Sequence, residues 1–96
     1  GVAATVCQLW YGENSSMHFQ INFTLHLSGM IERILLQQTL SATREEEEQA
    51  VAHPRSLQLT ECLAELETTF NLSVPLSEKY YLFVMLDTQN NTQVIH

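Results

Sequence analysis

Residues 17–27 carry an apolar pattern that fits two kinds of secondary structure. Apolar and polar side chains alternate through this segment, which is the period of a half-buried strand. Apolar residues also recur at every third or fourth position over residues 19–34, as on one face of a helix. Only the helical pattern continues past the segment, and eleven residues would be long for a strand. We therefore predict a helix over residues 16–38, capped by Ser15 or Ser16.

The rest of the chain also favours helices. Residues 43–46 read Thr-Arg-Glu-Glu, a capping-box sequence that predicts a helix start. A second helix is predicted from Pro54, because Leu59, Leu63, Leu66 and Phe70 are spaced by four, three and four residues.

Both ends of the chain give weaker patterns. A short helix over the first residues is followed by a turn at residues 11–14. Ser77 can cap a last helix over residues 78–87, and the polar residues 88–96 are interpreted as a flexible tail. The pattern as a whole predicts an all-α fold, a compact bundle of four to five helices.

Composition limits the function classes. A hydrophobic share of 45% over 96 residues predicts one globular domain, residues 1–96. The net charge of −7, with only four Lys and Arg, argues against direct contact with nucleic acid. No apolar run is long enough to span a membrane. The start of the chain lacks a signal-peptide pattern, and we interpret it as the boundary of a piece excised from a longer protein.

Cysteine usage bears on the compartment. Cys7 and Cys62 lie far apart and form no metal-type pair, so a reducing, cytoplasmic location is the simpler expectation. Four Asn-x-Ser/Thr sequons would instead suit a secreted protein. One of them, at Asn22, lies in a segment too apolar for a glycan-bearing loop.

The candidate chemistry lies in the predicted helix 16–38. His26 and Arg33 are seven residues apart, so on a helix they point the same way within roughly 20°. A nucleophilic imidazole beside a guanidinium is a plausible place to hold a phosphoryl group. Asn22, one turn earlier, could orient the ring by a hydrogen bond. The competing interpretation makes His26 a hydrogen-bonded core residue.

Other sites are poorly supported. His18 shares a helical face with His26, but eight residues separate them by roughly 12 Å, too far for one metal ion. His53 and His96 fall in a predicted linker and the predicted tail. No glycine-rich phosphate loop is present, so we expect neither a metal nor a cofactor.

Two segments resemble one known family. The first is residues 25–35, Leu-His-Leu-Ser-Gly-Met-Ile-Glu-Arg-Ile-Leu. The second is residues 63–82, Leu-Ala-Glu-Leu-Glu-Thr-Thr-Phe-Asn-Leu-Ser-Val-Pro-Leu-Ser-Glu-Lys-Tyr-Tyr-Leu. In this order and spacing they are similar to the PTS regulation domain of bacterial sugar-operon regulators. The first segment looks most like the C-terminal regulation domain of levanase-operon-type activators, which work with the alternative sigma factor.

The resemblance implies a fold and a role. It implies an all-α bundle of about five helices, often a homodimer, within a transcriptional regulator and without catalytic activity. It implies that His26 accepts phosphate from HPr or a sugar-specific EIIB, and Arg33 matches the arginine that follows this histidine in the family.

The chain also departs from the family pattern. Met85 or Leu86 stands where many members carry a second phosphorylatable histidine, and Leu25 replaces an acidic residue. Two alternatives therefore remain open. The first is a degenerate dimerisation module that is not phosphorylated, and the second is a histidine phosphotransfer domain.

Overall fold

The predicted all-α fold is confirmed by a computed structural model, which describes residues 1–95 and the side chains of residues 1–88. Residues 1–95 contain helices and no strand. In chain order the elements are α1 (Val2–Tyr11), the 3₁₀ turn η1 (Gly12–Asn14), α2 (Met17–Leu35), α3 (Arg44–Ala52), α4 (Ser56–Phe70) and α5 (Leu76–Ile95).

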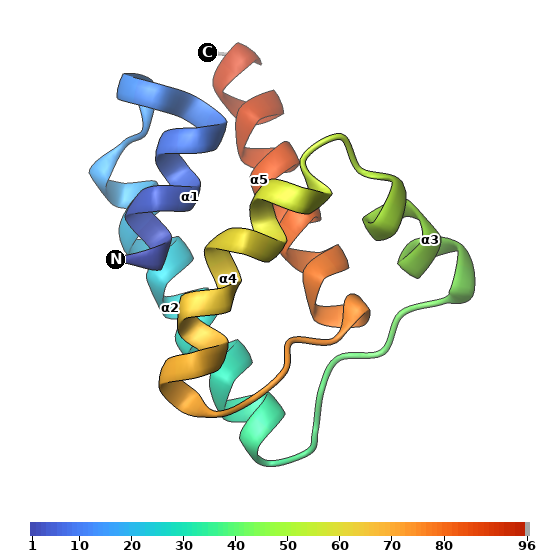
Figure 1. Cartoon of the computed structure of the whole chain (residues 1–96). Coiled ribbons are helices and arrows are strands. Elements are labelled where there is room, and N and C mark those ends of the chain that lie inside the picture. The colour runs from blue at the N-terminus through green and yellow to red at the C-terminus, as the bar shows by residue number, and fades with distance from the viewer. Residues whose placement is uncertain (96) are drawn as a thin grey trace.

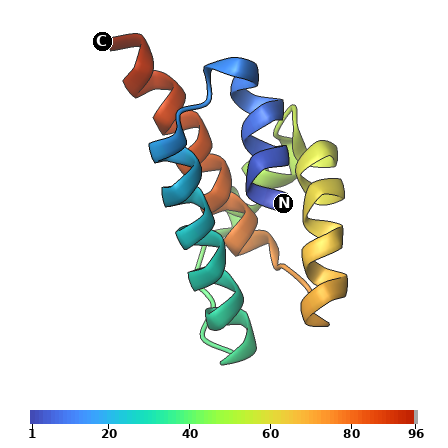
Figure 2. The same cartoon turned by 90° about the vertical axis from the view of Figure 1, so that its left-hand side faces the viewer.

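The helices pack around α5. In Figure 1, α5 passes behind α4, with α1 and α2 on one side of it and α3 on the other. Helix α1 contacts α2 and α4, and α3 contacts α5 and α4. Figure 2 shows α2 alongside α5. The side chains between these two helices form the candidate site.

The ambiguous segment 17–27 is helical, so the strand alternative is wrong. Helix α2 begins as predicted, because the Ser16 hydroxyl accepts a hydrogen bond from the Phe19 N–H at 3.0 Å. It ends at Leu35, three residues before the predicted end. There the chain turns with Gln37 in the left-handed region, at φ 57°.

The helices α3 and α4 start differently. The capping box of α3 is confirmed, since Thr43 Oγ1 accepts from the Glu46 N–H and the Glu46 carboxylate accepts from the Thr43 N–H. Helix α4 begins at Ser56 and not at Pro54, because the preceding residues form a turn closed by a hydrogen bond from the Ser56 N–H to the His53 carbonyl.

Helix α5 corrects two expectations. It begins at Leu76, so Ser77 lies inside the helix rather than capping it, and the Lys79 N–H donates to the Pro75 carbonyl. The helix runs to Ile95, which makes most of the predicted tail helical. No glycine or proline follows Pro75 in the sequence, so a helix anchored by buried residues can propagate through polar ones. His96 lies outside the described residues.

One apolar core holds the five helices together. Its buried members come from every helix and from the loop before α5: Val6, Cys7, Tyr11, Phe19, Phe23, Leu27, Met30, Ala50, Leu59, Leu63, Leu66, Val74, Leu82, Phe83 and Leu86. Three of the four predicted stripe residues of α4 are buried, whereas Phe70 is 46% exposed at the end of its helix.

Candidate functional site

A hollow between α2 and α5 contains the ring of His26. Its volume is about 400 Å³, and the loop between α2 and α3 closes one side. The lining residues are Phe19, Asn22, His26, Leu40, Tyr81, Val84, Met85 and Thr88. The predicted site residue His26 therefore lies at a cavity, not in the packed core.

His26 has an unusual environment. The residue is half-buried, and its Nε2 is the one buried side-chain nitrogen or oxygen without a hydrogen-bond partner among the residues the structure describes. Burial lowers the pKa of His26 below its ordinary value, and the charge of Arg33 lowers it further. The charge of Glu78 acts in the opposite direction. The ring is thus held neutral near pH 7, with one nitrogen unused.

This environment predicts a pH dependence. In an NMR titration we expect His26 to titrate below 6.5, its ordinary pKa. The unfolded chain binds a proton on this ring more readily than the folded chain does. The free energy of unfolding should therefore fall as the pH is lowered from about 7 through the folded-state pKa. The variant His26→Gln should lack the contribution of this ring, so its free energy of unfolding, measured in urea, should fall less with decreasing pH than that of the parent. If the variant is as pH-dependent as the parent between about pH 7 and 5, the prediction is wrong.

Arg33 makes a two-point ion pair across the site. Its Nε and Nη2 donate to the two carboxylate oxygens of Glu78 on α5, at 3.0 and 2.8 Å. Glu78 is only 1% exposed and also accepts from the Leu40 N–H at 2.9 Å. Burial alone would raise the pKa of Glu78, but the hydrogen bonds from Arg33 and Leu40 outweigh it and hold the pKa below its ordinary value. Glu78 is therefore ionised at neutral pH.

Arg33 keeps part of its guanidinium for another partner. The two bonds to Glu78 use Nε and Nη2, and a guanidinium has five N–H donors in all. Its Nη1 lies beside Gly29, where an added Cβ would be 3.4 Å away. The sequence placed His26 and Arg33 together, and their electrostatic interaction agrees with that placement.

Asn22 does not make the hydrogen bond that the sequence suggested. Its Nδ2 lies 3.3 Å from Nε2 of His18, one turn toward the start of α2. Asn22 shares the hollow with His26, but its side chain is exposed and bonded to the other imidazole. We correct the orienting role expected for Asn22 accordingly.

The loop between α2 and α3 is tied to α5 beside the site. Tyr81 donates its hydroxyl to the Ser41 carbonyl at 2.6 Å, and Glu78 accepts from the Leu40 N–H. Sequence reasoning missed Glu78, Tyr81 and Leu40 as site residues. The one available signal was a carboxylate at the start of an otherwise apolar last helix.

Of Met85 and Leu86, only one shares the hollow with His26. Met85 lines the hollow, whereas Leu86 is fully buried and its carbonyl accepts a hydrogen bond from the Tyr11 hydroxyl. The thioether of Met85 is not a phosphate acceptor. The site therefore offers one imidazole.

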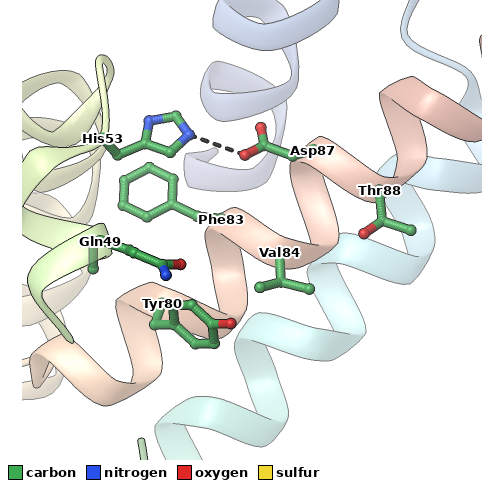
Figure 3. Close-up of a pocket in the computed structure, with 8 residues that line it drawn as sticks. Gln49, His53, Tyr80, Phe83, Val84, Asp87 and Thr88 are labelled. Carbon is green, nitrogen blue, oxygen red and sulfur yellow. Dashed lines mark hydrogen bonds and ion pairs between the residues drawn. The ribbon is translucent and has the colours of Figure 1, made fainter. Parts of the chain in front are cut away.

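A second hollow, of about 250 Å³, lies beside His53 (Figure 3). His53 Nδ1 accepts from the Arg55 N–H at 3.0 Å, and Nε2 lies 3.0 Å from an oxygen of Asp87. The ring stacks on Phe83 with centroids 3.9 Å apart, and Trp10 donates to the other Asp87 oxygen at 3.2 Å. His53 lies in the linker between α3 and α4, as predicted, and both of its ring nitrogens have partners there.

Two further features were sought in the described part of the chain, a cluster of metal-binding side chains and a membrane-crossing helix. Residues 1–95 hold no group of three histidine, cysteine or acidic side chains arranged to bind a metal ion. Within the same residues, none of the helices combines the length and apolar character needed to cross a membrane.

Comparison with known families decides what the chain is. The model of the family described as PRD domain matches residues 7–88, which include His26, Arg33 and Glu78. The chain belongs to the PRD family. A PRD domain is a PTS regulation domain, a regulatory module phosphorylated by phosphotransferase-system components such as HPr or EIIB. Searches among curated proteins and among solved structures found no match.

Proposed function

We propose that this PRD is the input domain of a bacterial transcriptional regulator and is phosphorylated on His26 in response to sugar. The observation that carries the proposal is the imidazole of His26, which lies at a hollow with Nε2 unpartnered and with Arg33 nearby. The donor would be HPr or a sugar-specific EIIB, and the regulator would work as a cytoplasmic homodimer. We further propose that the regulator is of the levanase-operon type, whose activators work with the alternative sigma factor.

The transfer needs a neutral ring. An imidazole nitrogen attacks the donor's phosphorus, a new N–P bond forms, and the donor's bond to phosphorus breaks with its electron pair returning to the donor. The lowered pKa of His26 supports this step, because a protonated ring has no lone pair to offer. Since Nε2 is buried, attack through that atom requires the side chains lining the hollow to move apart.

The new charge would act on the ion pair. A phosphoryl group on His26 adds about two negative charges close to the buried carboxylate of Glu78. Arg33 can offer its remaining N–H groups or leave Glu78 for the phosphate. If Arg33 leaves, the buried Glu78 carboxylate keeps only the Leu40 N–H of these three donors, and this unpaired charge destabilises the packing of α5 against the α2–α3 loop. A coupling of about 1–3 kcal/mol is enough to shift such an equilibrium.

The test is direct phosphorylation. The chain is incubated with EI, HPr or a panel of EIIB proteins, and labelled phosphoenolpyruvate. We expect an acid-labile label on the parent chain and complete loss of label in His26→Ala. Two variants serve as matched controls. His18→Ala removes an exposed imidazole at the start of α2, and His53→Ala removes the imidazole beside the second hollow.

Two outcomes would contradict the proposal. One is a parent chain that no donor labels, and the other is a His26→Ala chain that labels as strongly as the parent. Loss of label in His18→Ala with label retained in His26→Ala would move the acceptor to His18.

A second function is favoured by one observation. The burial of Nε2, together with Met85 opposite it, suits a degenerate dimerisation module in which His26 only packs. This alternative predicts no labelling by any donor. The third possibility, a histidine phosphotransfer domain, predicts that a labelled chain passes its phosphate onward when chased with excess acceptor protein.

A further inference from the structure

The outer face of α2 is apolar, and no other part of the described structure covers it. Met17, Ile21 and Leu25 are 72%, 53% and 65% exposed and lie four residues apart, so they form one ridge along the helix. The buried residues Phe19 and Phe23 lie on the opposite side. Alternation of apolar residues over 17–27 therefore reflects a helix with two apolar faces, of which the core uses one.

This outer ridge has the shape of a helix-packing surface. A shallow hollow of about 290 Å³ is lined by Met17, Gln20, Ile21, Thr24 and Leu25, all from α2. It is the groove between two rows of side chains spaced by four residues, into which a ridge of a second helix packs. The chemistry of the groove fits an apolar helix as its occupant.

The polar groups around the ridge can be buried without loss of hydrogen bonds. Thr24 donates its hydroxyl to the Gln20 carbonyl at 2.8 Å, and Ser28 donates to the Thr24 carbonyl at 3.1 Å. The Gln20 amide donates to the Ser15 hydroxyl at 3.1 Å. Burying a surface usually costs free energy because polar atoms lose their hydrogen bonds to water. Covering this face costs little in that way, because these polar groups already have partners within α2 or in Ser15.

Charge identifies the occupant. The chain carries −7, so two copies repel each other over most of their surface. Residues 14–31 contain no Asp, Glu, Lys or Arg, which makes the outer face of α2 a surface where two copies can meet without repulsion. A partner attracted by charge would be cationic and would be drawn to the glutamates of α3 instead.

We propose that the ridge of Met17, Ile21 and Leu25 is the contact surface of a homodimer, packed against the same ridge of a second copy. A two-fold axis near Ile21 would pair Met17 of each copy with Leu25 of the other. The two Glu32 side chains, each eleven residues along the helix from Ile21, would then lie roughly 30 Å apart, well beyond the screening length at physiological salt. The centre of such a contact carries no charged residue, because Glu13 and Glu32 lie just outside the two ends of the stretch 14–31.

The proposal rests on the homodimer of the proposed function and is tested on the purified chain alone. Sedimentation equilibrium should give a dimer whose association strengthens as added salt screens the repulsion. Ile21→Glu should raise the dissociation constant at least about tenfold, because it places a charge on each side of the axis. The matched control is Leu57→Glu. Leu57 is also an aliphatic residue exposed on a helix, with 70% of its surface accessible to solvent. It should leave the constant within about twofold.

The remaining outcomes are decisive. Amide resonances of α2 that shift on dilution, around Ile21 and Leu25, support this face. A chain that stays monomeric up to about 1 mM, or a dimer that Ile21→Glu leaves intact, overturns the proposal. If His26 is labelled in a chain that is monomeric, the proposed interface is wrong and the proposed phosphorylation stands. A dimer that accepts no phosphate would overturn only phosphorylation.

Discussion

Replacing Arg33 by alanine is expected to lower the free energy of unfolding by about 3 kcal/mol. The substitution leaves the Glu78 carboxylate, 1% exposed, without the two hydrogen bonds that pair its charge. Of the three hydrogen bonds that Glu78 accepts, only the one from the Leu40 N–H would remain. Urea unfolding followed by circular dichroism measures the loss. Its size matters for function, because the same pair carries the proposed response to phosphate.

A surface cation provides the control. Lys79 donates to the Thr60 hydroxyl at 3.3 Å in an exposed position, so Lys79→Ala should cost no more than about 0.5 kcal/mol. The double variant Arg33→Ala with Glu78→Gln should be more stable than Arg33→Ala alone, because it removes the buried charge. Equal losses for the two single alanine variants would mean that the ion pair contributes little.

Phe23→Ala should cost about 4 kcal/mol, the largest effect we expect from a single truncation. Phe23 is fully buried on the inner face of α2, and its ring stacks on Phe19 with centroids 5.9 Å apart. The cavity left behind removes both apolar burial and ring contacts. The midpoint of thermal unfolding should fall by roughly 20 °C for a domain of this size.

The control for this prediction is Leu57→Ala on the exposed side of α4, which should change the free energy of unfolding by no more than about 0.5 kcal/mol. A Phe23→Ala chain within about 1 kcal/mol of the parent would show that α2 is not held by its inner face. In that case the inner face of α2 would not be what holds His26 in the hollow between α2 and α5.

Local sequence determined most of the helices. The capping box at Thr43 and the apolar stripe of α4 depend on neighbours three or four residues apart, so they are visible without tertiary structure. The helix ends were less certain. The predicted start at Pro54 and the predicted end before Thr88 were both wrong, because turn bonds and helix propagation decide them.

The candidate site was predicted in part. His26 and Arg33 lie on one helix, and their spacing alone places them on one side of it. Glu78, in contrast, is 45 residues from Arg33, and no local pattern pairs them. His53 likewise has its partner Asp87 34 residues away, and no local pattern joins the two.

What the sequence determined by itself is the all-α fold and the presence of an imidazole and a guanidinium on one helix, because helical periodicity is a property of near neighbours. Only the tertiary structure decided that the guanidinium is paired with a buried carboxylate, that Asn22 bonds to His18, and that one apolar face of α2 stays exposed. These depend on how α5 packs against α2, and such packing joins residues whose separation along the chain carries no signal.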